Sequence, residues 1–510
     1  MKKNVFFVLV LACVMSTAAL GTMSVAAPEP SALKFGEDGH LLPSAGDKIK
    51  TFEMDEEGKI KQPSVVYYVS VQTGSDANDG KSVDAPFKTI RKAVSLMAPG
   101  VAVRILPGEY EETFWENNKR GTEENPIWIG GYDPDGKGTR PLMKSSQGFF
   151  HSSNCSYLIF HDMEITTPPF PGEKKYRTGI HALNTADGSD FVFRNLYVHH
   201  VHDSPLKFAG ANHYFVLDCE VSHDQQGLRG SGSIDNVGCH HNIVAYNYIH
   251  SGVGIGIVYK GGSANNDIYN NLIVNPGITA ITMGQSTGRE FFRPPLTDDR
   301  TTYEAQNIRA YSNIIIGGRA PLQMISSRGC YFVNNTVIHP SHWIFRILNN
   351  DSEDQLKLAN FGNPHDNVIA NNIFYYFSPS GEHLNVSANV KPEDRKSIII
   401  SNNIFYNVTN PGRVPPNFNE FGVSENHFVD PQFNDPANPP LTEERLRAIN
   451  PSAMRTKFML KEGSPAAGVG RDYPFAKEDH NSVPFANPRS LGALEKNPPS
   501  PDTPFIIQGF

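Results

Sequence analysis

FVFRNLYV (191–198), IVAYNYIH (243–250) and IYNNLIVN (268–275) repeat one phrase, in which apolar residues alternate around a central asparagine. RAYSNIIIG, YFVNNTVI, VIANNIFY and IIISNNIFY continue the series, and FVLDCEVS fits the same frame with Cys219 in the asparagine position. The phrase returns about every 22 to 42 residues, a self-similarity that is typical of a solenoid. Its asparagines are Asn195, Asn247, Asn271, Asn313, Asn335, Asn372 and Asn403.

Each copy of the phrase predicts a strand, because it alternates with period two, is rich in Val, Ile, Phe and Tyr, and lacks helical spacing. Stacked copies then form parallel sheets. Asparagine suits a repeated corner because it tolerates left-handed backbone. Its amide can also donate to one neighbour along the stack and accept from the other. The sequence therefore predicts an all-β solenoid with a buried asparagine ladder.

Composition bounds the partners of the chain. Its 510 residues suffice for one large solenoid with additions at the ends. The formal net charge is −8 and 19% of the residues are charged, so we expect no general attraction to nucleic acid or membranes. An acidic polymer would have to bind to a local row of basic residues. We expect a monomer.

The N-terminus has the pattern of a secretory signal. Lys2 and Lys3 precede an apolar run, and small residues follow it, so residues 1–27 are predicted to be a signal peptide. Cys13 lies in a loose lipoprotein-like box, but the apolar run continues past it, so a lipid anchor is the less favoured alternative. No later stretch is apolar and long enough to span a bilayer. A secreted or periplasmic location follows.

Four cysteines remain after cleavage, too few for a disulfide scaffold. They are Cys155, Cys219, Cys239 and Cys330. A bridge between Cys219 and Cys239 stays open, as does the alternative that Cys219 is a small buried member of the ladder.

The chain divides into four segments. Residues 28–64 are predicted to be an irregular leader, 65–408 a parallel β-helix domain, and 409–510 a tail packed on it. A solenoid needs a cap over its first coil, and the amphipathic stretch at about 87–97 predicts a short helix there. Long insertions on a rigid scaffold are usually functional or form a cleft. They interrupt the coils at 167–178, 286–304, 350–365 and 376–396.

Three stretches together resemble a known superfamily. They are YYVS…GSDANDG…PFKTIRKAV…RILPGEY (67–110), the asparagine ladder, and the late FML-x-x-GSPAAGVG (458–470). The chain resembles secreted right-handed parallel β-helix proteins of the pectate-lyase-like superfamily, especially polysaccharide lyase family 9. The resemblance implies a right-handed parallel β-helix with an N-terminal helix cap and an irregular C-terminal tail. It implies action on polysaccharides, but such folds also include epimerases and glycoside hydrolases.

A row of basic residues is expected on the strands that follow the asparagine corners. Alternation in SPLKFAG, GLRGSGS and GIGIVYKGG turns Lys207, Arg229 and Lys260 outward. Arg328 and Arg346 continue the row. Cations about 4.8 Å apart on adjacent coils suit an extended polymer with one carboxylate per sugar. The plainer interpretation is a solvated rim of scattered charges.

Lys260 is the sharpest catalytic candidate. A lysine has an unperturbed pKa of ~10.4, which neighbouring cations and burial both lower. The resemblance implies a lysine base on this sheet, and therefore Lys260 in that role. Lys207 and Arg229 would neutralise the substrate carboxylate. The family also carries an Asp-Asp-Gly-x-Asp phrase that binds calcium, whereas this chain offers only dispersed aspartates, of which Asp203 and Asp224 are the candidate ligands.

Histidines and aspartates cluster in the turns before these strands. HHVHDSP (199–205) and SHDQQG (222–227) should stack, which brings His202, His223 and His250 near Asp203 and Asp224. A His–Asp pair, here centred on His223, can act as a general acid or base near pH 7. A transition-metal site and simple turn chemistry are the alternatives.

The insertion at 286–304 holds a third set of candidates. Arg289 and Arg293 flank two phenylalanines just after an expected cleft-floor strand. Arginine forks onto carboxylates and aromatic rings stack on sugars, so this loop is a candidate cleft wall. A packed surface loop is the alternative.

These observations favour a secreted lyase that cleaves a uronate-containing polysaccharide by β-elimination. A uronate epimerase would share the proton abstraction. A hydrolase would need two carboxylates roughly 5–10 Å apart, from Glu290, Glu304, Asp203 and Asp224. A non-catalytic glycan-binding β-helix protein is the rival outside enzymes.

Overall fold

A computed structural model describes residues 49–167, 178–184, 189–223, 231–297, 299–350, 361–377, 383–436 and 456–496. The predicted signal peptide and Cys13 lie outside these ranges. Within them, no helix is long and apolar enough to cross a membrane.

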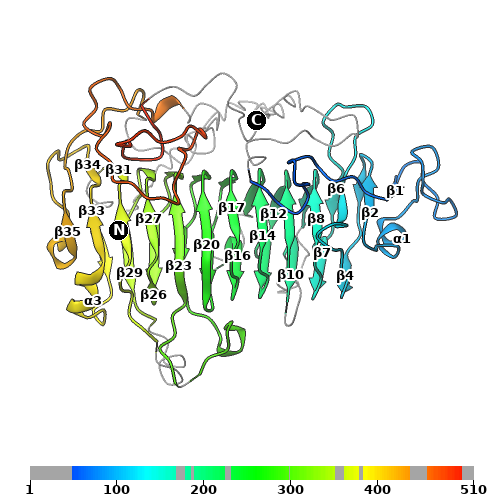
Figure 1. Cartoon of the computed structure of the whole chain (residues 1–510), viewed down its shortest axis with the longest axis horizontal. Coiled ribbons are helices and arrows are strands. Elements are labelled where there is room, and N and C mark those ends of the chain that lie inside the picture. Colours follow the sequence, from blue (N-terminus) through cyan, green and yellow to red (C-terminus); the bar gives the residue numbers. More distant parts are fainter. Residues whose placement is uncertain are drawn as a thin grey trace, which may run out of the picture.

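Three parallel sheets wind along one axis as a right-handed parallel β-helix (Figure 1). Successive strands of the chain fall on different sheets, and each strand pairs with strands of the coils before and after it. The predicted fold class is confirmed. The alternating apolar residues explain the arrangement, because each coil buries one face of every strand inside the solenoid.

The first sheet has fourteen described strands. They are β1 (Val65–Val69), β2 (Val101–Ile105), β5 (Ile127–Gly131), β8 (Leu158–His161), β11 (Phe191–Arg194), β14 (Tyr214–Leu217), β17 (Ile243–Ala245), β20 (Ser263–Tyr269), β23 (Ala305–Tyr311), β26 (Ser327–Arg328), β27 (Tyr331–Val333), β30 (Val368–Ala370), β33 (Ile399–Ser401) and β35 (Gly422–Ser424).

The second sheet has ten described strands. They are β4 (Phe114–Asn117), β7 (Phe150–Ser153), β10 (Ile180–Leu183), β13 (Leu206–Ala209), β16 (Gly232–Val237), β19 (Ile255–Lys260), β22 (Thr279–Met283), β25 (Ala320–Ile325), β29 (Trp343–Leu348) and β32 (His383–Val386).

The third sheet has eleven described strands. They are β3 (Glu109–Tyr110), β6 (Leu142–Lys144), β9 (Glu164–Thr166), β12 (Tyr197–Val201), β15 (Glu220–His223), β18 (Tyr248–His250), β21 (Leu272–Val274), β24 (Ile314–Ile316), β28 (Thr336–Ile338), β31 (Ile373–Tyr376) and β34 (Ile404–Asn407).

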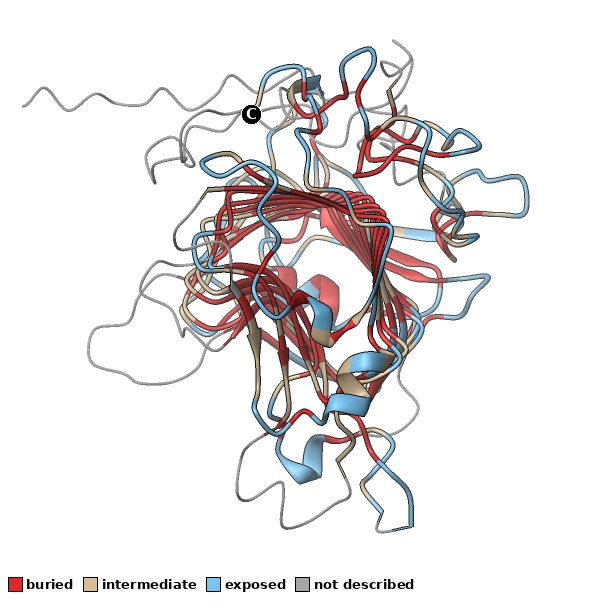
Figure 2. Ribbon diagram, turned by 90° about the vertical axis from the view of Figure 1, so that its left-hand side faces the viewer, coloured by how far each residue is buried: buried red, intermediate tan, exposed pale blue. Residues whose placement is uncertain are grey.

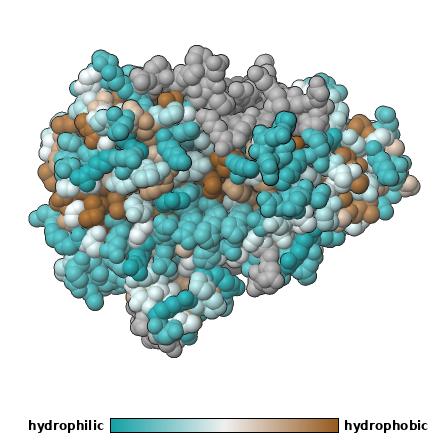
Figure 3. Space-filling model, viewed as in Figure 1, coloured by the Kyte–Doolittle hydropathy of each residue, from teal (hydrophilic) through white to brown (hydrophobic). Residues whose placement is uncertain are grey.

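The core fills the inside of the solenoid, which Figure 2 shows along its length as stacked buried strands. Aromatic rings of successive coils lie face to face inside it. The rings of Phe160 and Phe193 are 5.3 Å apart and inclined by 2°, and those of Phe374 and Phe405 are 4.8 Å apart and inclined by 4°. On the face drawn in Figure 3 most residues are hydrophilic, and hydrophobic residues gather near the end where Figure 1 places β33 and β35.

The asparagine ladder is present and buried. The backbone N–H and the side-chain amide of Asn313 both donate to Asn335 Oδ1 at 3.0 Å, while Asn313 Oδ1 accepts the same two bonds from Asn271. The pattern runs unbroken through the asparagine column, which consists of Cys219, Asn247, Asn271, Asn313, Asn335, Asn372, Asn403 and Asn426.

Asn195 is not a column member. Its φ of 53° is left-handed, and it corresponds to Asp218 and Asn270, which also precede a column residue. Leu196 occupies the column position in that coil, since Glu220 donates to its carbonyl as Tyr248 donates to that of Cys219. The left-handed corner and the stacked amide therefore belong to two consecutive residues, whereas the sequence interpretation assigned both to one.

Helices and the tail close the solenoid. The helix α1 (Ile90–Val94) is shorter than expected, because Thr89 caps it and Ser95 ends it. The other described helices are α3 (Pro392–Ser397), η2 (Arg289–Phe291) and η3 (Phe418–Glu420). Apolar residues of the C-terminal segment, including Phe433, Phe458 and Leu491, pack on the outside of the third sheet.

All four cysteines after residue 48 are buried and free, so the Cys219–Cys239 bridge does not form. The Cys219 thiol donates to the carbonyl of Leu217 at 3.2 Å, and its N–H donates to Asn247 Oδ1 at 2.9 Å. Cys219 is therefore a buried member of the column.

We expect Asn313→Ala to lower the free energy of unfolding by ~2–4 kcal/mol, because it strips an acceptor from the buried amide groups of Asn271. Urea denaturation of the two proteins measures the difference. Asn410→Ala, at an exposed position, is the matched control. An unchanged midpoint for Asn313→Ala would show that the ladder contributes nothing to stability.

Candidate functional site

One row of outward side chains crosses the whole ten-stranded sheet. The pairing register aligns one residue from each strand, and the neighbours in this row are about 4.8 Å apart from strand to strand. From β4 to β32 the outward row consists of Trp115, His151, His181, Lys207, Asp235, Val258, Thr282, Gln323, Arg346 and Asn385.

Asp235, rather than Arg229, stands next to Lys207 in the outward row. Lys207 and Val258 each lie eleven residues after their column position, but Asp235 lies sixteen residues after Cys219. This coil is thus five residues longer before the strand, and Arg229 lies in the 224–230 segment, outside the described residues. The sequence interpretation put Arg229 in the row from the alternation in GLRGSGS, whereas the pairing register puts Asp235 there.

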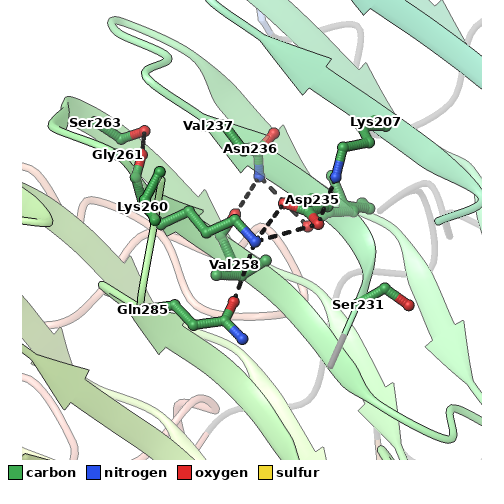
Figure 4. Close-up of polar contacts among 12 residues, drawn as sticks. Lys207, Ser231, Asp235, Asn236, Val237, Val258, Lys260, Gly261, Ser263 and Gln285 are labelled. Atoms are coloured by element: carbon green, nitrogen blue, oxygen red, sulfur yellow. Dashed lines mark hydrogen bonds and ion pairs between the residues drawn. The ribbon is translucent and has the colours of Figure 1, made fainter. Parts of the chain in front are cut away.

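Lys260 lies on β19 two residues after Val258, the row member of that strand, and pairs with Val237. Its side chain nevertheless reaches Asp235. Figure 4 shows both lysines converging on Asp235. Lys207 Nζ lies 3.0 Å from Asp235 Oδ2, and Lys260 Nζ lies 3.3 Å from Oδ1. Lys260 also donates to Gln285 Oε1 at 3.2 Å. Two amines and one carboxylate thus form a compact ion cluster near the middle of the row.

The ion cluster shifts the pKa of Asp235 and that of Lys207. Asp235 is 1% exposed; burial raises its pKa, but Lys260 and Lys207 outweigh burial and hold it below the ordinary value. For Lys207, burial lowers the pKa and Asp235 more than offsets it, so the pKa is raised. Lys207 is therefore a fixed positive charge at neutral pH, suited to neutralising an anion rather than taking a proton.

An aromatic group precedes the ion cluster in the row. Trp115, 71% exposed, stacks on His151 with centroids 4.0 Å apart and planes inclined by 9°. His181 lies between His151 and Lys207, and burial together with these two neighbours lowers its pKa to about 4. Its imidazole is neutral at pH 7 and keeps a lone pair free for a proton.

Asp203 lies in the turn before β13 and is nearly buried. Burial raises its pKa, and Lys207 opposes that shift only in part. Asp203 and Asp235 therefore have pKa values displaced in opposite directions beside the same lysine.

The described donors do not fit a calcium site. Calcium takes six to eight oxygen ligands, whereas the oxygens of Asp235 face ammonium groups. Over the ranges that the structure covers, no three His, Cys, Asp or Glu side chains gather where they could hold a metal ion. Asp224, the second predicted ligand, lies outside the described residues.

The predicted histidine cluster is spread over the third sheet and the turn after it. His250 lies on β18, where Nε2 is 2.7 Å from Glu220 Oε1 and the ring stacks on Tyr248. His202 lies in the turn between β12 and β13, and His223 ends β15 with a side chain outside the described set. His250 is therefore engaged outside the outward row.

The 286–304 insertion borders the row. Gly238 and Gly262, at the ends of β16 and β19, leave room for it: an added Cβ would come within 2.7 Å of Arg293 Cβ and 2.5 Å of Arg293 O. The Arg293 guanidinium donates to the carbonyls of Glu290 and Phe292 within its own loop. Arg289 is exposed.

Glu304 fastens this insertion to the strand that carries Lys260. It is fully buried, and its carboxylate accepts bonds from Gly261 N at 2.8 Å, Thr287 N at 3.0 Å and Asn350 Nδ2 at 3.1 Å. Burial raises its pKa to about 7. A carboxylate so enclosed positions the loop and does not reach a substrate.

Arg328 and Arg346 lie on different sheets. Arg346 belongs to the outward row, on β29. Arg328 is on β26 of the fourteen-stranded sheet, over the ring of Tyr303. The sequence interpretation missed three members of the outward row, which are Trp115, His151 and His181. A signal for the two histidines was present, because FHS (150–152) and IHA (180–182) place a polar residue between two others as LKF (206–208) does around Lys207.

Comparison with known proteins supports the fold. A family model described as a protein of unknown function (DUF1565) matches residues 72–291, less than half of the chain. The lacto-N-biosidase of Bifidobacterium longum subsp. longum is 25% identical over 323 residues, which are 48% of this chain and 20% of that enzyme. The match thus spans about a fifth of that relative.

Solved structures share the fold at low identity. Pectate lyase Pel9A is similar with a TM-score of 0.51 and 15% identity, over 86% of this chain and 98% of that one. A rhamnogalacturonan lyase is similar with a TM-score of 0.48 and 17% identity, over 81% of this chain and 98% of that one. The resemblance to the pectate-lyase-like superfamily is confirmed for the fold.

We expect Asp235→Asn to destabilise the protein by about 3 kcal/mol at pH 7, because it leaves two amines without their buried partner. A depressed pKa contributes stability above the ordinary value near 3.8 and loses it as the pH falls through the folded value. The gap between the wild type and the variant should therefore close below about pH 4. Urea midpoints across pH measure it, and a constant gap would refute the ionic cause.

Proposed function

We propose that this chain is a carbohydrate-active enzyme that binds a glycan along the outward row, and that it cleaves a uronate-containing polysaccharide by β-elimination. The observation that carries the proposal is the convergence of Lys207 and Lys260 on one point near the middle of the row. A second anion, the carboxylate of a uronate, can be neutralised there because the cluster has one positive charge in excess.

The proposed reaction needs no oxidant or reductant. A base removes the proton on the carbon next to the uronate carboxyl. The electron pair forms a carbon–carbon double bond as the bond to the leaving sugar oxygen breaks, and that oxygen takes up a proton. Lys207 stabilises the negative charge that develops on the carboxyl group in the transition state.

Two side chains are candidates for the base. Lys260 is the one predicted from the sequence, and it must leave its ion pair with Asp235 to take a proton. His181 is the candidate that the structure adds, because it is neutral at pH 7 and adjoins Lys207. Removing a general base lowers the reaction rate typically by 10²–10⁴-fold. The rates of the Lys260 and His181 variants therefore show which side chain is the base.

A glycoside hydrolase is the second candidate. Two carboxyl groups with oppositely displaced pKa values are the arrangement that hydrolases use, one ionised and one protonated. Asp235 would be the ionised group and Asp203 the acid. The sequence similarity to a lacto-N-biosidase favours this reaction as well. An epimerase would leave the polymer uncut.

Secretion, a monomeric state and calcium dependence remain predictions. Cleavage before residue 28 can be read from the N-terminus of the exported protein. A chelator tests calcium, because activity that survives it excludes an essential, exchangeable ion.

We expect new ultraviolet absorbance from a conjugated double bond when the protein is mixed with pectate, alginate or a glycosaminoglycan. Lys207→Ala should lower the rate about 100-fold or more, and either Lys260→Ala or His181→Ala should do the same. Lys137→Ala, at an exposed ion pair on a loop, is the matched control. Absence of the signal on all three polymers would count against the lyase.

The hydrolase is tested on the same samples by the release of reducing ends without ultraviolet absorbance. In that case Asp203→Asn and Asp235→Asn should each abolish release. Reducing ends that persist at the wild-type rate in both variants would remove these carboxyls from the reaction. A protein that binds a glycan but forms neither a conjugated double bond nor new reducing ends would be a non-catalytic glycan-binding protein.

A further inference from the structure

A pair of arginines that has no carboxylate partner among the described residues lies at the far end of the outward row. Arg346, half-buried on β29, and Arg319, exposed just before β25, both place their guanidinium groups over the ring of Trp343, at 4.3 and 5.0 Å from its centroid. The backbone brings them together, because Trp343 N donates to the carbonyl of Arg319 at 2.9 Å.

The partners of Arg346 are neutral. Its Nε donates to Asn385 Oδ1 at 3.0 Å and Nη1 donates to Gln323 Oε1. Burial and the charge of Arg319 lower its pKa, and no carboxylate offsets them in the described chain. Two like charges at a partly desolvated position repel each other, and cation–π contacts of ~0.5–1 kcal/mol offset that repulsion only in part.

This pair of cations contrasts with the net charge of the chain. At −8, the protein has more acidic than basic groups, yet no described acid pairs with these arginines. Some other partly buried arginines have carboxylate partners, as with Arg395 and Glu420 or Arg309 and Asp267. Others have none among the described residues, as with Arg104, whose guanidinium lies over the ring of Tyr132. An uncompensated pair of planar forks beside a flat ring is the arrangement that binds an anionic group carried on a sugar.

We propose that Arg319, Arg346 and Trp343 form a second anion subsite, which takes a carboxylate or sulfate group of a glycan while the ring packs against the sugar. Arg346 and Asp235 occupy the same row four strands apart, roughly 19 Å. A glycan that follows the row would meet a cation at both points. That path rests on the proposed function, but the anion-binding chemistry of the subsite does not.

Calorimetric titration of the intact protein with three hexasaccharides tests the subsite. Oligogalacturonate presents carboxylates, a chondroitin sulfate hexasaccharide also presents sulfates, and cellohexaose is the neutral comparison. We expect Arg319→Gln and Arg346→Gln each to weaken binding of an acidic hexasaccharide about 10-fold or more and to leave cellohexaose unaffected. If the variants lose affinity for both acidic hexasaccharides, the subsite binds a carboxylate. If they lose affinity for chondroitin sulfate alone, it binds a sulfate group.

The Arg319→Gln variant also distinguishes a role of Arg319 in glycan binding from a role in stability. No side-chain hydrogen bond or ion pair of Arg319 is lost from the described residues, so its melting temperature should stay the same or rise. A lower melting temperature, or unchanged affinity for both acidic ligands, would overturn the proposal. Arg471→Gln, which breaks an exposed pair with Glu425, is the matched control.

The two proposals fail in different ways. Weakened acidic binding in Arg319→Gln with no product from any polymer supports the subsite and counts against the enzyme. Product formation with an unchanged KM and affinity in the same variant supports the enzyme and overturns the subsite.

Discussion

The hydrogen bond from the backbone N–H of one column residue to the side-chain oxygen of the next sets the geometry of the coils from Cys219 to Asn426. Asn271, Asn313 and Asn335 show its form, with both the N–H and the side-chain amide donating to the same oxygen. Because these groups are fully buried, a shift of one residue would leave polar groups unpaired, at a cost of ~1–3 kcal/mol each. The ladder thereby locks the coils in register, and the register aligns the outward row.

Coil length then decides which chemistry reaches that row. A coil of the common length puts Lys207 and Val258 in register, and the longer coil between them delivers Asp235 to the same point. The result is a carboxylate between two amines near the middle of the row. Lys260 can therefore act as a base only after it leaves its ion pair with Asp235. Otherwise the base must be a different residue, such as His181.

Charge along the row is graded from one end to the other. The first strands present Trp115, His151 and a neutral His181, the middle carries the ion cluster, and the far end has Arg346 beside Arg319. A glycan lying along the row would thus meet an aromatic surface, a cluster with one positive charge in excess, and a cationic end. Such an arrangement gives a polymer one preferred direction, because reversing it exchanges the charged and uncharged ends.

The sequence by itself determined the solenoid, the strand parity that turns Lys207 outward, and the candidacy of Lys260 and Arg346, because alternation and repeat spacing are local properties. It failed for Asn195, which occupies the left-handed corner while Leu196 takes the column position. It also missed Asp235 as the neighbour of Lys207, since this coil is five residues longer. Only the tertiary structure decided that Asp235 meets both lysines, that Glu304 is enclosed, and that Arg319 joins Arg346. Those contacts join residues of different coils, and their meeting depends on the length of every intervening turn, which a repeat phrase does not encode.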